Sequence, residues 1–131
     1  MDIEIRKLNK KVDERGWLIE IIGNSQLKGK IGLVYLTVAR PGVVKGNHYH
    51  NRKTEWFCVI KGKGILVLVD EKNNEKKEIN VSEDDLSIIK IPPGIIHAIK
   101  NTGKEDLYLL AHISEEYNVN DPDTFFKEVL K

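Results

Sequence analysis

Apolar and β-branched residues recur along the chain in runs of strand length, separated by short polar runs rich in glycine, proline, asparagine and aspartate. This pattern is typical of strands joined by turns. We therefore predict an all-β sandwich or barrel with strands in the segments 16–22, 31–39, 55–60, 64–70, 86–91, 95–100 and 107–114. The polar segments 71–77 and 81–85 are predicted to be turns.

A helical pattern replaces the strand pattern only near residue 121. Asp121 is a candidate N-cap, and Pro122 suits the first helical position. Phe125, Phe126 and Val129 follow at a spacing that places them on one helix face. The sequence therefore predicts one short C-terminal helix after the strands.

Three histidines and a glutamate are the candidate ligands of a metal site. His48 and His50 are two residues apart, so on a strand both point to one face, about 6.6 Å apart along the backbone. Glu55 follows after the tight polar connection 51–54, and His97 can reach the same point from another strand. Three imidazoles and a carboxylate predict a site for one divalent transition metal, with Zn, Fe(II), Mn, Ni and Cu(II) all compatible.

Length and charge narrow the class of protein. The 131 residues suit one domain spanning 1–131. Because 21 basic residues nearly balance 20 acidic ones, nucleic acid is not predicted as a partner. No apolar stretch reaches the length of a signal peptide or a membrane span, so we predict a soluble, cytoplasmic protein. The single cysteine, Cys58, lies in an apolar run and is predicted to be a buried hydrophobe without chemistry.

The spacing around the candidate metal ligands resembles the two motifs of the cupin family. The resemblance implies a double-stranded β-helix, or jelly-roll barrel, that holds a metal inside. Cupins include oxygenases, isomerases, epimerases and sugar-sensing domains, so the fold alone does not select a function. The matching positions are Gly42, His48, His50, Glu55 and Gly62 in the first motif and Pro92, Gly94, His97 and Asn101 in the second.

Two flanking segments resemble the dTDP-4-dehydrorhamnose 3,5-epimerases and the sugar-nucleotide 3,4-ketoisomerases. In the segment DERGWLIEI, the resemblance implies that Arg15 faces a phosphate and Glu20 the nucleotide end of the substrate. In KGNHYH, it places Lys45 where those enzymes have a phosphate-contacting arginine and His48 where they have the catalytic base. His50 departs from the pattern, because those epimerases carry glutamine there.

RPG at 40–42, KGNHYH at 45–50, Glu55, GKG at 62–64, a proline-glycine turn before His97 and EEYNVNDPDTFFKEV at 115–129 occur together in this chain. This combination resembles the C-terminal cupin domain of bacterial capsule-sugar reductases over most of the chain. It implies epimerisation at C3 of a UDP-4-keto-6-deoxy-HexNAc in cell-surface polysaccharide biosynthesis, with Zn as the first metal to expect. The related epimerases also imply a homodimer. Because the sequence has no G-x-G-x-x-G segment, we expect any reduction to come from a separate reductase partner.

His48, Glu55 and Tyr35 are the candidates for proton transfer. A residue that ligates the metal does not easily serve as a base, so the sequence leaves two roles open for His48. Tyr35 could equally be a packing residue, and Arg15 and Lys45 could be ordinary surface charges. Two alternatives to an epimerase or ketoisomerase also remain at this point: a metal-dependent, Fe-containing cupin oxygenase, and a non-catalytic module that binds a sugar nucleotide.

Overall fold

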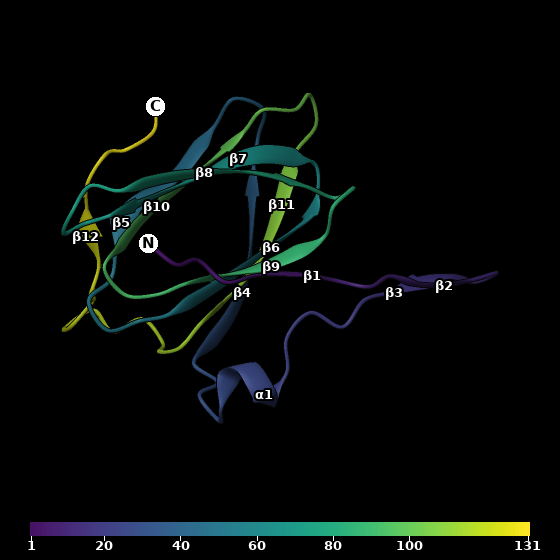
Figure 1. Cartoon of the computed structure of the whole chain (residues 1–131), viewed down its shortest axis with the longest axis horizontal. Helices are drawn as coiled ribbons and strands as arrows, with labels where there is room; N and C mark the ends of the chain where they lie inside the picture. Colours follow the sequence, from purple (N-terminus) through teal and green to yellow (C-terminus); the bar gives the residue numbers. More distant parts are fainter.

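The computed structural model describes all residues, 1–131, and its regular secondary structure is almost entirely antiparallel strand (Figure 1). One five-stranded sheet has the order β1 (Ile5–Lys7), β9 (Ser87–Ile91), β6 (Glu55–Lys61), β11 (Leu107–Ile113) and β4 (Leu33–Ala39). We call it the first sheet. The second sheet has the order β12 (Phe125–Phe126), β5 (Val44–Tyr49), β10 (Ile95–Asn101), β7 (Lys63–Asp70) and β8 (Lys76–Ser82). The two sheets face each other and enclose the site.

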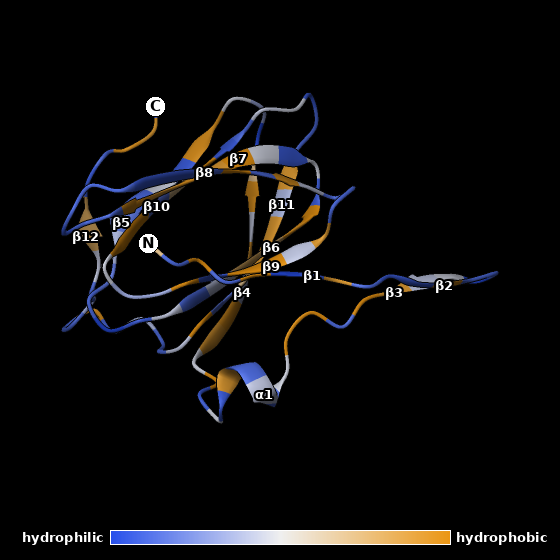
Figure 2. Ribbon diagram, in the orientation of Figure 1, coloured by the Kyte–Doolittle hydropathy of each residue, from blue (hydrophilic) through white to orange (hydrophobic).

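Apolar side chains on the facing sides of the two sheets form the core. Figure 2 shows that hydrophobic residues recur along the strands of both sheets. On β11, Leu107, Leu109 and Ala111 point inward and are buried, whereas Tyr108 and Leu110 between them are half-buried on the outside. This period of two is what a sheet with one buried face requires. The all-β prediction is therefore confirmed.

The structure departs most clearly from the predicted strands and turns in the segment 16–22 and at β8 (Lys76–Ser82). Of the segment 16–22, only β3 (Gly16–Leu18) is a strand, and Ile21 and Ile22 instead pack on the outer face of the first sheet. β8 crosses a region predicted to be two turns. It is an edge strand whose other residues are charged or polar, so only Ile79 and Val81 contribute an apolar signal, which is too weak to predict a strand.

The prediction of a C-terminal helix is wrong. Asp123 has a φ of +48°, outside the right-handed helical region. Phe125 and Phe126 form β12, which pairs with Tyr49 and His48 of β5. The backbone groups that a helix would pair internally are instead satisfied by β5, since the N–H of Lys127 bonds to the Asn47 carbonyl. The only helix is α1 (Asn24–Leu27), between β3 and β4.

A two-stranded hairpin of β2 (Lys11–Asp13) and β3 projects from the barrel (Figure 1). Its apolar side chains Val12, Trp17 and Leu18 are each more than half exposed. No helix here has the length and apolar character needed to cross a membrane.

Candidate metal centre and adjoining pocket

A bulge in β5 aims His48 into the barrel. His97 of β10 pairs with His48 and the next residue, Ala98, pairs with Gly46, so Asn47 is the extra residue. Gly46 and Asn47 have φ values of +99° and +59°. A Cβ on Gly46 would lie 2.6 Å from the His97 carbonyl oxygen, so only glycine lets the two strands approach this closely.

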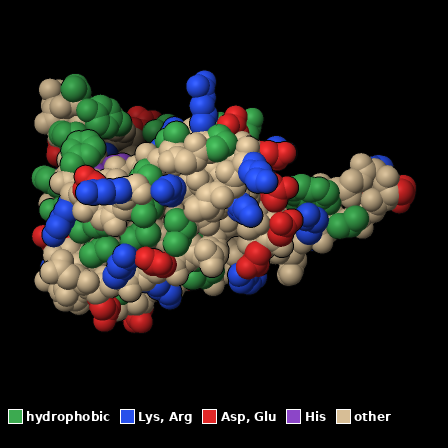
Figure 3. Space-filling model, turned by 90° about the horizontal axis from the view of Figure 1, so that it is seen from above, with side chains coloured by type: hydrophobic (Ala, Val, Ile, Leu, Met, Phe, Trp, Pro, Cys, Tyr) green, Lys and Arg blue, Asp and Glu red, His purple; other side chains and the backbone are tan.

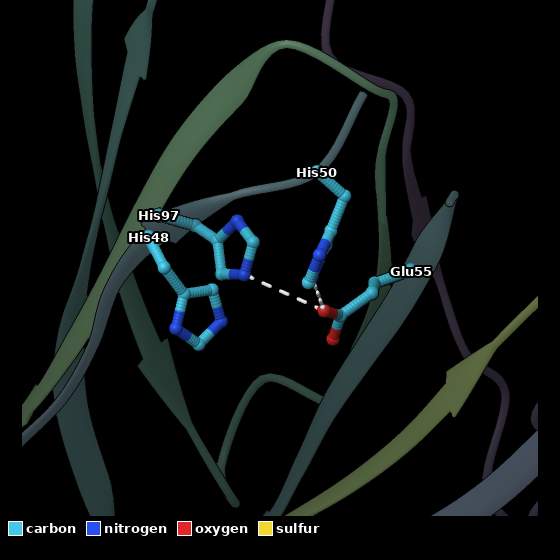
Figure 4. Close-up of side chains that lie close together, drawn as sticks. All are labelled: His48, His50, Glu55 and His97. Atoms are coloured by element: carbon cyan, nitrogen blue, oxygen red, sulfur yellow. Dashed lines mark hydrogen bonds and ion pairs between the residues drawn. The ribbon is translucent and has the colours of Figure 1, made fainter. Parts of the chain in front are cut away.

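The structure brings together the four residues that the sequence predicts as metal ligands (Figure 4). His48 lies near the end of β5 and His50 directly follows that strand, whereas Glu55 begins β6 and His97 lies on β10. One nitrogen or carboxylate oxygen from each lies within 4.8 Å of the others. His50, Glu55 and His97 are buried, at 6%, 2% and 2% exposure, whereas His48 is only partly buried.

Two backbone carbonyls fix how the buried imidazoles are protonated. His50 Nδ1 lies 2.6 Å from the Asp123 carbonyl oxygen, and His97 Nδ1 lies 3.0 Å from the Ile95 carbonyl oxygen. Because a carbonyl only accepts, Nδ1 is the protonated nitrogen in each neutral ring and Nε2 carries a lone pair. A carbonyl on the far nitrogen is the usual support of a metal-ligating histidine.

Both of these Nε2 atoms face Glu55. The distance to Glu55 Oε1 is 2.6 Å from His50 Nε2 and 3.5 Å from His97 Nε2, and the latter atom is buried without a hydrogen-bond partner. Two imidazole nitrogens and a carboxylate directed at one point are a donor set that favours a cation between them. The donor set therefore fits a divalent metal ion.

The surroundings of the cluster shift the pKa values of its residues in different directions. Burial acts to raise the pKa of Glu55, but the contacts with His50 and His97 outweigh it and hold that pKa below its usual range. Burial lowers the pKa of His50, and the bonds to Glu55 and to the Asp123 carbonyl outweigh it, so the net shift is upward. Without a metal, a proton on His50 Nε2 satisfies Glu55; metal binding would displace this proton.

His48 and Tyr35 differ from the anchored residues. Burial, together with the neighbouring His97 and His50, lowers the pKa of His48 to about 4, so its ring is neutral near pH 7. No hydrogen bond holds this ring. Tyr35 donates its hydroxyl hydrogen to Glu55 Oε2 at 2.9 Å, and burial followed by the Glu55 charge raises its pKa, so the phenol stays protonated.

A pocket of about 390 Å³ opens beside the cluster, lined by Tyr35, His48 and His97 and by largely apolar neighbours. Lys45 also lines it, and its Nζ donates to Thr37 Oγ1 at 2.6 Å. Figure 3 shows a histidine side chain within a hollow at the end of the molecule away from the projecting hairpin. A substrate in this pocket would contact a neutral imidazole, a phenol and one cationic side chain.

The structure does not bring Arg15 and Glu20 to this pocket. Arg15 is at the tip of the β2–β3 hairpin, where it pairs with Asp13 at 2.6 Å. Glu20 is exposed and pairs with Lys11 at 3.3 Å. The prediction that both contact substrate therefore finds no support from the residue positions within one copy of the chain.

Sequence reasoning missed two residues at the site. Asp123 was assigned to a helix, and the ligand-holding contact of its backbone carbonyl has no signature in the sequence. Thr37 is one of several threonines and serines on strands, and only the fold shows that it holds Lys45.

Residues 11–125 match the polysaccharide biosynthesis C-terminal domain family. The chain is 31% identical over 113 residues to a UDP-2-acetamido-2,6-beta-L-arabino-hexul-4-ose reductase of Pseudomonas aeruginosa, a match covering 86% of this chain and 29% of the reductase. It is 27% identical over 130 residues to the probable low-salt glycan biosynthesis epimerase Agl13 of Haloferax volcanii, covering 93% of this chain and 83% of that one. The name of the second relative, an epimerase, agrees with the isomerase class that the sequence predicts.

Solved structures share the fold. The capsular polysaccharide assembling protein CapF of Staphylococcus aureus has a TM-score of 0.74 at 37% identity, over 93% of this chain and 34% of CapF. The dTDP-6-deoxy-D-glucose-3,5-epimerase RmlC of Legionella pneumophila has a TM-score of 0.84 at 17% identity, over 98% of this chain and 73% of that one, and shares the fold alone. The jelly-roll cupin fold is thus confirmed.

The chain spans about a third of CapF and a smaller share of the reductase. The match over residues 11–125 covers most of the sequence, including all four residues of the cluster. This chain therefore belongs to the polysaccharide biosynthesis C-terminal domain family.

Proposed function

We propose that this protein is a sugar-nucleotide 3-epimerase or ketoisomerase that acts on a 4-keto-6-deoxyhexose nucleotide in cell-surface polysaccharide biosynthesis. The observation that carries the proposal is the pocket that opens directly onto the His/Glu cluster, beside a neutral histidine and a protonated tyrosine. The names of the reductase and epimerase relatives support the substrate class. Any reduction of the product would be carried by a reductase partner.

We further propose that the cluster holds one divalent metal, with Zn expected first and Fe, Mn or Ni as substitutes. His50, Glu55 and His97 would hold it, because each is buried and the two rings are fixed by carbonyl bonds. If His48 completed the set of four ligands, the tetrahedral zinc site would be closed and the metal would be structural. With His48 free to act as a base, three protein ligands would leave an open position at which the metal would polarise the substrate ketone.

Proton transfer would fall to the residues that line the pocket. His48 is neutral, unanchored and in the pocket wall, so it can accept a proton from the carbon next to the ketone. Tyr35 can donate to the carbon or the oxygen, since its hydroxyl is protonated. Glu55 would act in proton transfer through Tyr35, whose hydroxyl it holds. Lys45, fixed by Thr37, would bind a phosphate of the nucleotide.

A homodimer would account for the two residues that lie far from the pocket. The outer face of edge strand β4 exposes Val34, Leu36 and Val38, an apolar surface in a position where strands pair or pack. A second copy packed there could bring its projecting hairpin, with Arg15 and Glu20, toward this pocket (Figure 1).

The dimer is tested by sedimentation velocity on wild type, Leu36→Asp and Val119→Asp. A charge in an apolar sheet contact should convert a dimer into monomer, so Leu36→Asp is expected to sediment as monomer. Val119→Asp places the same charge at an exposed site outside both sheets and should leave the dimer unchanged. A wild type that is monomeric at tens of micromolar would contradict the dimer.

The function is tested by NMR in D₂O with UDP-4-keto-6-deoxy-HexNAc and dTDP-4-keto-6-deoxyglucose. Metal-loaded wild type should exchange the hydrogen next to the ketone for deuterium, chelator treatment should stop the exchange and metal should restore it. Tyr35→Phe should keep its metal and exchange at least about 100-fold more slowly, because it lacks the proton donor. Bound metal without exchange on either nucleotide would reject the epimerase in favour of a binding module or an oxygenase.

A further inference from the structure

The connection between two of the proposed ligands is held by the C-terminal segment of the chain. Residues 51–54 join His50 at the end of β5 to Glu55 at the start of β6. The carboxylate of Asp123 accepts hydrogen bonds from the backbone N–H groups of Asn51 and Arg52, both at 2.9 Å, and of Lys53 at 3.3 Å. Asp123 is 4% exposed, so these three bonds are formed inside the protein, where a lost partner is costly.

The backbone of the same residue holds the imidazole. The Asp123 carbonyl oxygen accepts the hydrogen bond from His50 Nδ1 at 2.6 Å. Its left-handed φ of +48° turns the carbonyl and the carboxylate toward the same connection. One residue therefore sets both the orientation of the His50 ring and the path of the chain that leads to Glu55.

Further contacts from the same segment support this arrangement. Lys53 Nζ donates to the Pro122 carbonyl at 3.1 Å, and the Thr54 N–H donates to Ser114 Oγ at 3.0 Å. On the other side of His48, the Asn47 side-chain oxygen accepts the N–H groups of Val129 and Leu130, at 2.8 and 3.1 Å. Both ends of the segment that carries the two histidines are thus bonded to residues 114–130.

We infer that Asp123 is a positioning residue of the metal centre, which holds His50 in the ligating tautomer and fixes the spacing between His50 and Glu55. The inference rests on the metal site of the proposed function. Partners of this kind typically contribute 10–100-fold to metal affinity, because they orient the ligands before the metal binds. Asp123 touches neither metal nor substrate and acts through His50.

The test is a Co²⁺ titration followed by visible absorption, on wild type, Asp123→Ala, Asp123→Asn and Asp121→Ala. Asp123→Ala should bind Co²⁺ about 10–100-fold more weakly and show a changed ligand-field spectrum at saturation. Asp123→Asn keeps an acceptor oxygen and tolerates a left-handed backbone. Its Co²⁺ affinity should therefore lie between those of wild type and Asp123→Ala, and its spectrum at saturation should match that of wild type. Asp121→Ala is the matched control: it removes an exposed carboxylate that also contacts Arg52 but not the His50 ring, and should bind as wild type.

Thermal unfolding of the metal-free proteins separates positioning from general stability. A purely structural role would lower the unfolding temperature of Asp123→Ala but leave the saturated Co²⁺ spectrum unchanged, which would overturn the inference. Equal Co²⁺ affinity of wild type and both Asp123 variants would also overturn the inference. If Asp123→Ala does not fold, the Co²⁺ affinity of Asp123→Asn relative to wild type decides the test. A wild type that binds neither Co²⁺ nor Zn²⁺ would instead reject the metal centre itself.

Discussion

Glu55→Gln is expected to lose the metal while keeping the fold. The Glu55 carboxylate is buried between His50 Nε2, His97 Nε2 and the Tyr35 hydroxyl, and it supplies the only negative charge of the cluster. Glutamine has the same shape but no charge, and its amide N–H can donate to the lone pair that a metal would otherwise use. Affinity for Zn²⁺ should fall at least about 100-fold, since loss of a ligand exceeds the effect of its supports.

Elemental analysis of the purified protein and the deuterium-exchange assay measure this result. The control is Glu78→Gln on β8, an exposed glutamate paired with Lys76 that should retain both metal and activity. A Glu55→Gln protein that still carries one metal per chain would remove Glu55 from the ligand set. Metal loss with full exchange activity would instead show that the exchange does not need the metal.

Gly46→Ala is expected to destabilise the fold and to displace His48 at the same time. The added Cβ would lie 2.6 Å from the His97 carbonyl oxygen and 3.2 Å from Ala98 Cα, which are backbone atoms that cannot rotate away. The positive φ of +99° adds strain for any other residue. Together these effects should lower the free energy of unfolding by about 2–4 kcal/mol.

Urea unfolding of Gly46→Ala and Gly42→Ala separates the two causes. Gly42 also has a positive φ, +80°, but a Cβ there meets nothing within 4 Å, so only the backbone strain remains. Gly42→Ala should therefore cost about 1–2 kcal/mol and leave metal binding intact. Equal destabilisation by the two substitutions would show that the β5 and β10 strands can separate locally at little cost.

The sequence predicted those parts of the fold that depend on local pattern. Strands with one buried face can be predicted from the alternation of apolar and polar residues. The spacing of four residues also predicted a cluster that the structure contains, formed by His48, His50, Glu55 and His97. The bulge at Asn47 was not predicted, because a single extra residue leaves the hydrophobic pattern almost unchanged.

The wrong helix prediction has a physical cause, which is that long-range contacts override local preference. The segment after Asp121 has helical spacing, yet its backbone finds partners on β5, more than 70 positions earlier in the sequence. The substrate contacts of Arg15 and Glu20 stay a prediction, because within one copy of the chain both residues are exposed and away from the pocket. In the proposed dimer, the hairpin of one copy would lie near the pocket of the other. Such a contact depends on the assembly and cannot be predicted from the sequence pattern of one chain.

The dependence of the His50 segment on Asp123 has a consequence for the order of assembly. During synthesis the histidines of β5 leave the ribosome long before residue 123, and until that residue arrives the His50 ring has no carbonyl to fix it. Pairings between such distant segments form late in folding. For the proposed metal site, we therefore expect the nascent chain to close its barrel before it binds an ion, the reverse of a zinc finger, whose ion drives folding.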